Sequence, residues 1–122
     1  LKISYVPQDC TFLSGQLDDW IEQCHSDLTL VKTLLRKLGF SREHFDIPLE
    51  KLSQGQKKKV MLAISLASPA HLYIWDEPLN YIDIFSRIQI EQAILTYQPT
   101  LLFVEHDQYF QQKIATEVID FS

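Results

Sequence analysis

Short apolar runs alternate along the chain with longer segments in which apolar residues recur every three or four positions. Residues 2–6 are rich in β-branched and aromatic side chains and end at Pro7, as expected of a strand. Residues 72–75 form a continuous apolar run, and in residues 100–104 four apolar residues follow a threonine, as is typical of buried strands in a parallel sheet. The pattern also predicts an edge strand at residues 117–121.

Helical spacing of apolar residues marks two segments between these strands. Leucine and valine recur at that spacing over residues 28–38, with Ser26 as the expected N-cap and Gly39 as the stop. A second helix is expected over residues 56–66, where a stripe of apolar and small residues precedes Pro69. Each helix is therefore expected to bury one apolar face.

A third helix is expected to begin after Asp83, which can cap it, and to extend towards Tyr97. Its inward-facing residues are expected to be Ile84, Ile88 and either Ile94 or Leu95. Alternation of buried strands with helices predicts an α/β unit that has a parallel sheet. The segment 17–48 is mostly helical in pattern and is expected to form a lobe apart from that sheet.

Polar residues follow two of the predicted strands at the point where each strand ends. Asp76 and Glu77 directly follow one run, and His106 lies just beyond the next run along the chain. Because parallel sheets bind ligands beyond the carboxyl ends of their strands, these side chains are expected at one edge. One carboxylate there can hold Mg²⁺ while the other orients or deprotonates a water. The alternatives are a polar turn for the two acids and, for His106 read alone, a surface or hydrogen-bonded histidine.

The segment 52–56 stands at the expected start of the second helix. Unpaired backbone N–H groups and the helix dipole favour an anion at such a start, and Gly55 would let a phosphate approach closely. The alternative is that Ser53 is only a helix cap. The three lysines at residues 57–59 are expected to form a solvated face.

Composition and charge limit the possible functions without choosing among them. The 122 residues suit one domain or part of one, and 46% hydrophobic with 22% charged residues is typical of a folded soluble protein. The net charge of −5 argues against a nucleic-acid surface over the whole chain. No apolar run is long enough to span a membrane and residues 1–6 do not resemble a signal peptide, so we expect a cytosolic protein.

The two cysteines give only a weak case for a metal site. Cys24 adjoins His25, but no second closely spaced pair of Cys or His completes the usual set of ligands. We therefore expect Cys10 and Cys24 to be reduced thiols with a structural role.

Four segments of the chain, in this order, resemble the motifs of ATP-binding-cassette ATPases. They are the glutamine loop Tyr5-Val6-Pro7-Gln8, the signature Leu52-Ser53-Gln54-Gly55-Gln56, the Walker B strand Leu72-Tyr73-Ile74-Trp75-Asp76-Glu77 and the switch region Val104-Glu105-His106-Asp107. The resemblance implies an α/β fold that is a partial P-loop NTPase core of the ABC type, with parallel strands and an inserted helical subdomain. It divides the chain into a glutamine-loop strand at residues 1–8, a helical subdomain at 9–52 and a core part at 53–122.

The same resemblance implies a role for each motif residue in the binding and hydrolysis of ATP with Mg²⁺. Asp76 would hold Mg²⁺, and Gln8 would contact both Mg²⁺ and water. Glu77 would orient the attacking water, and His106 would contact the γ-phosphate. At an interface with a second nucleotide-binding domain, the residues implied in nucleotide binding are Ser53, Gln54, Gly55, Gln56 and Asp83.

Finer features resemble the ABC-F class of cytosolic tandem ATPases. They are the stretch Pro78-Leu79-Asn80-Tyr81-Ile82-Asp83 after the glutamate and the region His106-Asp107-Gln108-Tyr109-Phe110. Within that class the sequence is most similar to antibiotic-resistance proteins that act on the ribosome, which implies the ribosome as a partner. Two alternatives are the nucleotide-binding subunit of a membrane transporter and an interaction module without catalytic activity.

The sequence has no P-loop, which requires the pattern G-x-x-x-x-G-K-S/T. None of its glycines, Gly15, Gly39 and Gly55, is followed by lysine. In the family this loop precedes the glutamine loop, so we expect it before Leu1, in a longer protein. We expect the chain to belong to the second cassette of that protein rather than to the first. We expect the chain alone to bind ATP weakly, to hydrolyse it negligibly and to self-associate through apolar sheet surface.

Overall fold

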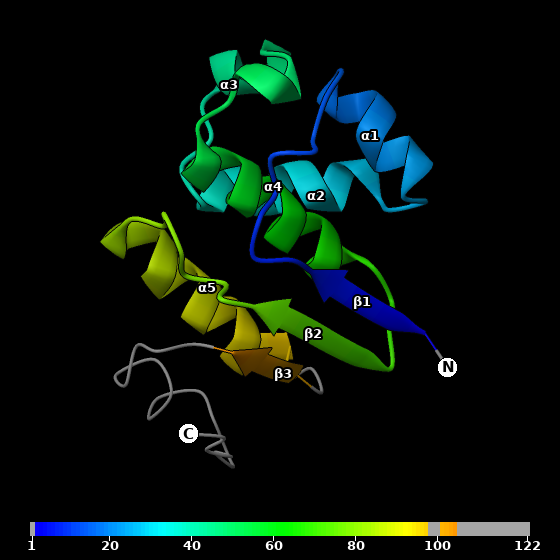
Figure 1. Ribbon diagram of the computed structural model, residues 1–122, viewed down its shortest axis with the longest axis vertical. Helices are drawn as coiled ribbons and strands as arrows, with labels where there is room; N and C mark the ends of the chain where they lie inside the picture. Colours follow the sequence, from blue (N-terminus) through cyan, green and yellow to red (C-terminus); the bar gives the residue numbers. More distant parts are fainter. Residues whose placement is uncertain (1, 98–100, 105–122) are drawn as a thin grey trace.

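Three parallel strands form one sheet in the order β1, β2, β3 (Figure 1). The strands are β1 (Ile3–Val6), β2 (Leu72–Asp76) and β3 (Leu101–Val104). The computed structural model describes residues 2–97 and 101–104 of the chain. Val6 pairs with Trp75 and Asp76 pairs with Val104, so the carboxyl ends of all three strands meet at one edge. The predicted α/β unit with a parallel sheet is therefore confirmed.

The segment between β1 and the signature sequence is helical, as predicted. Its elements are α1 (Leu17–Gln23), α2 (Leu28–Lys37), α3 (Arg42–Asp46) and the short 3-10 helix η1 (Leu49–Lys51). Apolar side chains from three of them, Ile21, Leu35 and Leu49, are fully buried. Figure 1 shows these helices on one side of α4 and the sheet on the other.

Asp27 and Gly39 set the two limits of helix α2. Asp27 caps the helix, because its side chain accepts a hydrogen bond from the Leu30 backbone N–H at 3.1 Å. The prediction that Ser26 is the cap was wrong, since its hydroxyl lies 2.8 Å from that of Ser68 instead. Gly39 has a φ of 94°, a left-handed geometry that suits glycine, and it follows the helix as predicted.

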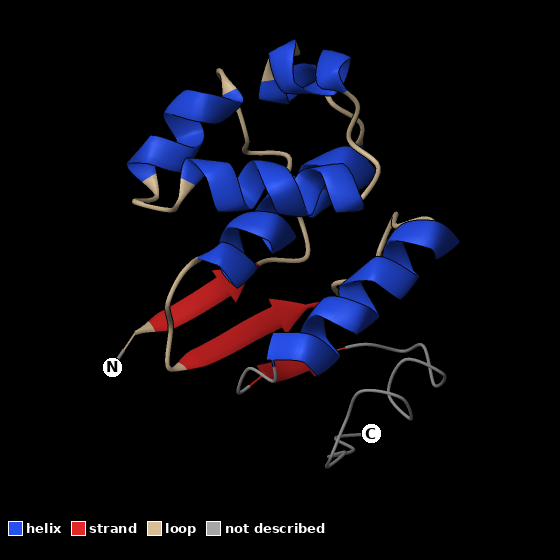
Figure 2. Cartoon of the chain, turned by 180° about the vertical axis from the view of Figure 1, so that it is seen from behind, coloured by secondary structure: helices blue, strands red, loops and turns tan. Residues whose placement is uncertain are grey.

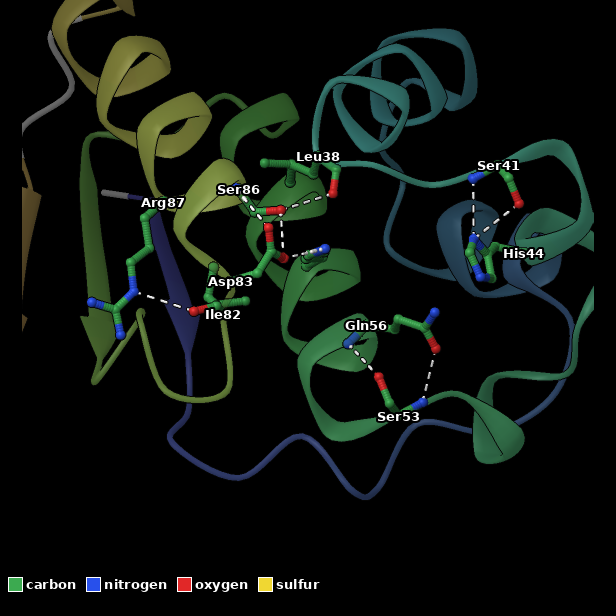
Figure 3. A network of polar contacts seen from close by, with 10 residues as sticks. Leu38, Ser41, His44, Ser53, Gln56, Ile82, Asp83, Ser86 and Arg87 are labelled. Atoms are coloured by element: carbon green, nitrogen blue, oxygen red, sulfur yellow. Dashed lines mark hydrogen bonds and ion pairs between the residues drawn. The ribbon is translucent and has the colours of Figure 1, made fainter.

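Helix α4 (Gln54–Ala67) lies between the sheet and the helices α1, α2 and α3 (Figure 2). It begins two residues earlier than predicted because Ser53 is its N-cap. The Ser53 hydroxyl accepts from the Gln56 N–H at 3.1 Å, and the Gln56 side chain accepts from the Ser53 N–H at 3.0 Å (Figure 3). Further along, Ser65 accepts a hydrogen bond from the buried indole of Trp75 at 3.0 Å, which joins α4 to β2.

Helix α5 (Ile84–Tyr97) lies beside β2 and β3 in both views of the chain (Figures 1 and 2). The prediction of its inward face was partly wrong: Ile94 is buried, but Ile84 is 76% exposed and Ile88 is 42% exposed. The buried face runs instead through Ser86, Ile90 and Ile94. The Ser86 hydroxyl donates to the Leu38 carbonyl at 3.0 Å, and this contact turns that face towards α2.

One face of the sheet carries exposed apolar side chains in β1. Val6 is fully buried, whereas Ile3 and Tyr5, which point to the opposite face, are more than half exposed. Within β2, Trp75 is the buried residue and its neighbours in the strand are half-buried. In the part of the chain that the structure describes, no helix is both long and apolar enough to cross a membrane.

Candidate active site

Three polar side chains meet just beyond the ends of β1 and β2. The Gln8 side-chain amide donates a hydrogen bond to Glu77 Oε2 at 3.2 Å, although the two residues lie 69 positions apart. The Asn80 side-chain amide donates to the same oxygen at 3.1 Å. Two amides thus orient one carboxylate at the edge where parallel sheets bind their ligands. The resemblance assigns Gln8 and Glu77 to one ATP site, and the hydrogen bond between their side chains is a finding of the structure.

The backbone after β2 forms a turn that directs Glu77 towards Gln8. Glu77 has a φ of 46° and Tyr81 a φ of 65°, both in the left-handed region. This geometry costs a non-glycine residue about 1–2 kcal/mol, so it persists only where the surroundings hold it. The Asn80 N–H donates to the Glu77 carbonyl at 3.2 Å, which closes the turn. Asn80 therefore contributes to the site through both its backbone and its side chain.

Gly55 brings the start of α4 against this turn. A Cβ atom at Gly55 would collide with the Tyr81 carbonyl oxygen. The sequence offered a different reason for this glycine, the close approach of a phosphate. The contact with Tyr81 is a sufficient reason within the chain itself, because only a residue without a side chain lets the two backbones lie so close.

Asp83 caps α5 and is held by a lysine from α4. Its carboxylate accepts from the Ser86 N–H at 3.0 Å and shares the single Ser86 hydroxyl proton, at 2.9 Å, with the Leu38 carbonyl (Figure 3). Lys59 forms an ion pair with it at 2.9 Å. Burial would raise the pKa of Asp83, but the bonds from Lys59 and Ser86 outweigh burial and hold that pKa well below its usual range. The predicted cap is confirmed, and the ion pair was not foreseen.

The three lysines of α4 do not form the solvated face that the sequence predicts. Lys58 is only 1% exposed, and its ammonium donates to the Pro7 carbonyl at 2.9 Å and to the Gln8 carbonyl at 2.8 Å. Lys57 is 9% exposed, and the Lys59 side chain is 12% exposed. The reason is the position of α4, which packs against β1 and against α2.

An open hollow of about 340 Å³ lies next to the Gln8–Glu77 contact. Its lining includes Gln8, Asn80 and the first residue of α4, Gln54. Lys57 adds a positive charge to it, and Asp9 adds a negative one. The hydrogen bond from the Thr11 backbone lowers the pKa of Asp9, which favours its ionised form. The hollow therefore offers charged and amide groups to a polar ligand.

Two side chains at this edge, Gln8 and Asp76, carry oxygen atoms that suit a Mg²⁺ ion. Gln8 turns its amide nitrogen towards Glu77, which leaves its oxygen as the atom suited to a hard cation. Asp76 ends β2 at the same edge of the sheet. Magnesium is usually held by one or two carboxylates together with substrate phosphates. Among the described residues, no group of three or more His, Cys, Asp or Glu side chains is placed to hold a metal.

The remaining predicted site residues are placed as follows. Ser53 and Gln56 form the capping box of α4, and Gln54 lines the hollow. His106 and the predicted edge strand at residues 117–121 lie outside the described residues. Sequence reasoning did not assign Asn80 or Lys58 to the site. The signal for Asn80 was its position three residues after Glu77, whereas the run of three lysines at residues 57–59 gave no signal that distinguishes Lys58.

Comparison with known families tests the resemblance directly. The model of the ABC transporter family matches residues 1–80, which include both the segment up to Gln8 and the turn up to Asn80. The chain belongs to the ABC transporter family. Its membership agrees with the order of the four motifs and with the parallel sheet that brings Gln8 and Glu77 together.

Individual relatives of this ABC family chain come from bacteria and plants. The ribosome protection protein VmlR of Bacillus subtilis (strain 168) is 37% identical over 83 residues, which make up 68% of this chain and 15% of VmlR. ABC transporter F family member 5 of Arabidopsis thaliana is 36% identical over 90 residues, or 74% of this chain and 13% of that protein. The chain thus spans about a seventh of the length of these curated relatives.

A solved structure supports the ABC-type fold. It is the complex of the archaeal ribosomal stalk protein aP1 with the archaeal ribosome recycling factor aABCE1. The match has a TM-score of 0.75 and 26% sequence identity, and it covers 93% of this chain and 24% of the matched chain. The described strands and helices therefore have the arrangement of an ABC ATPase domain.

Proposed function

We propose that the chain is part of an ABC-F ATPase that binds and hydrolyses ATP at an interface between two nucleotide-binding domains. The observation that carries this proposal is the shared hydrogen bonding of Gln8 and Asn80 to one oxygen of Glu77. A carboxylate that is held in this way at the end of a parallel strand is suited to orient an attacking water. Asn80 also belongs to the stretch that resembles the ABC-F class.

In the proposed reaction, the chain supplies orientation and ligands. Glu77 orients the water, and the turn that begins with it keeps the carboxylate beside Gln8. Asp76 and the Gln8 amide oxygen are the proposed ligands of Mg²⁺, which when bound offsets the negative charge of the phosphates. His106 is the proposed contact of the γ-phosphate. Because phosphoryl transfer depends mainly on positioning and charge stabilisation, a small displacement of Glu77 is expected to be costly.

The start of α4 is proposed to face a nucleotide that the second domain holds. Ser53 and Gly55 are the proposed contacts of its γ-phosphate, with Gln54 and Gln56 beside them. The backbone N–H groups of a helix start favour an anion. Asp83 is proposed to lie at the same interface, with its ion pair to Lys59 fixing it relative to α4.

We further propose a cytoplasmic protein that acts on the ribosome, in the manner of antibiotic-resistance members of the ABC-F class. The similarity to a protein named for ribosome protection supports this assignment, as does the match to a complex that contains a ribosome recycling factor. The alternative is a subunit of a membrane transporter. Copurification of the intact protein with ribosomes would favour the ABC-F proposal, and copurification with membranes would favour the transporter.

The proposed catalysis is tested by magnesium-dependent ATP hydrolysis. The assay compares the chain with a version extended upstream through a P-loop, each beside its Glu77→Gln form. We expect activity in the extended protein and a loss of about 10²-fold or more in its Glu77→Gln form, because a positioned base contributes that much. An active Glu77→Gln protein would remove Glu77 from the catalytic role, and inactivity of every form would favour a non-catalytic module.

A further inference from the structure

Lys58 is a buried cation that is bonded to the backbone of the glutamine loop. Its side chain is among the largest fully buried ones in the described residues. The ammonium donates to two consecutive carbonyls, at 2.9 Å to Pro7 and at 2.8 Å to Gln8. The two carbonyls lie on either side of the Gln8 Cα atom. Fixing both of them fixes the direction in which the Gln8 side chain leaves the backbone.

A lysine side chain is energetically unfavourable at this buried position. A buried ammonium loses its hydration, and a residue such as methionine would fill similar space without that loss. Burial lowers the pKa of Lys58, while the negative charges of Asp76 and Glu77 oppose this shift. Among the described residues, no carboxylate lies close enough to form an ion pair with Lys58. Its direct bonds go to the backbone that carries Gln8.

We infer that Lys58 is a positioning residue, which holds the Pro7 and Gln8 carbonyls so that the Gln8 amide reaches Glu77. The chain of contacts runs from Lys58 through the Gln8 backbone to Glu77 Oε2. It links α4, the helix that begins within the signature segment, to the carboxylate proposed for catalysis. The inference rests on the proposed function for its catalytic meaning. Its structural content, the dependence of the Gln8 orientation on Lys58, can be measured separately.

The first test uses nuclear magnetic resonance of the 122-residue chain with ¹⁵N-labelled glutamine side chains. A Gln8→Ala variant identifies the Gln8 amide signal. In Lys58→Met we expect this signal to shift towards that of a solvated glutamine, and in Lys58→Arg, which keeps donors and charge, to stay close to the original. Lys57→Met is the matched control, since it removes the neighbouring ammonium, and should leave the signal in place. An unchanged Gln8 signal in folded Lys58→Met would overturn the inference.

If Lys58→Met fails to fold, a measurement on the unsubstituted chain still tests the inference. An ammonium that is buried and bonded to two carbonyls exchanges its protons slowly, so the Lys58 signal should be visible with ¹⁵N-labelled lysine. When the carbonyl carbons of Pro7 and Gln8 are labelled with ¹³C as well, the spectrum should also show couplings from that nitrogen to these two carbons. A rapidly exchanging Lys58 without these couplings would contradict the inference.

The catalytic consequence is measured in the protein extended upstream. We expect Lys58→Met to lower kcat by about 10²-fold while KM for ATP changes little, because the variant misplaces Gln8 without removing a nucleotide contact. Lys58→Arg should restore part of that loss. Equal loss of stability in both variants with an unchanged kcat would mean a purely structural lysine. A catalytically inactive unsubstituted protein would refute the proposed function and leave the resonance test of Lys58 standing.

Discussion

Gly55 joins two parts of the site because it has no side chain. The close approach of its backbone to the Tyr81 carbonyl lets α4 and the turn after Glu77 share one boundary. A phosphate contact, which the sequence suggests, and this contact within the chain are separate demands on the same residue. The contact with Tyr81 is expected to affect the stability of the chain even when no nucleotide is bound.

Gly55→Ala is expected to destabilise the chain by about 1–3 kcal/mol, the usual cost of forcing extra volume into a packed contact. The higher helix propensity of alanine offsets about 1 kcal/mol of that at most. Urea unfolding followed by tryptophan fluorescence measures the change. Gln54→Ala, at the exposed neighbouring position, is the control and should alter stability by less than about 0.5 kcal/mol. Equal stability of the two variants would show that the Gly55 contact carries no constraint.

The sequence predicted a place at the site for residues that belong to a known motif. It did not predict this for residues that only the fold brings to the site. The family motifs assigned Glu77 and Gln8 to the same site, and their side chains are in contact. Lys58 was expected in solvent because charged residues usually are, but α4 is covered on both sides. Burial of a helix face depends on what packs against it, and a run of three lysines contains no information about that.

At the scale of elements, one ion pair connects two helices. Lys59 in α4 and Asp83 at the start of α5 lie 2.9 Å apart, and Asp83 also caps α5 through Ser86. Since the Asp83 side chain is 53% exposed, solvent weakens this pair. Its contribution is therefore expected to be small, although it depends on pH in a defined direction.

Asp83→Asn is expected to lower the free energy of unfolding at neutral pH by about 0.5–1 kcal/mol, since asparagine keeps the cap but loses the charge. The folded-state pKa of Asp83 lies below its unfolded value, so the stabilisation is present above about pH 4 and is lost as the pH falls further. Urea unfolding of both proteins at several pH values tests this. A difference that persists unchanged well below pH 4 would contradict the assignment.

The elements themselves were easier to predict than their faces. The α2 segment has a clear apolar stripe, and Val31, Leu34 and Leu35 are buried as its spacing indicates. In α5 apolar residues surround the whole helix, so periodicity could not distinguish the face with Ile90 from the face with Ile84. The Ser86 contact with Leu38 selects between them, and a contact between such distant residues is not visible in local sequence.

At the scale of the whole molecule, a parallel sheet brings distant segments to one edge. The apolar runs predicted the sheet, and its register places Gln8 and Glu77 within hydrogen-bond distance. The exposed Ile3 and Tyr5 mark the face of the sheet opposite α4. The expected self-association through this face stays a prediction, because exposure alone does not identify what covers it.

The central claim is that Gln8 and Glu77 act as one catalytic unit, and a double-mutant cycle tests it most directly. Single-turnover hydrolysis of magnesium ATP is measured for the upstream-extended protein, for Gln8→Ala, for Glu77→Gln and for the double variant. We predict that each single substitution slows hydrolysis and that the double variant is no slower than Glu77→Gln, since residues of one unit are not additive. Losses that multiply in the double variant would show that the two residues act independently, and would contradict the account.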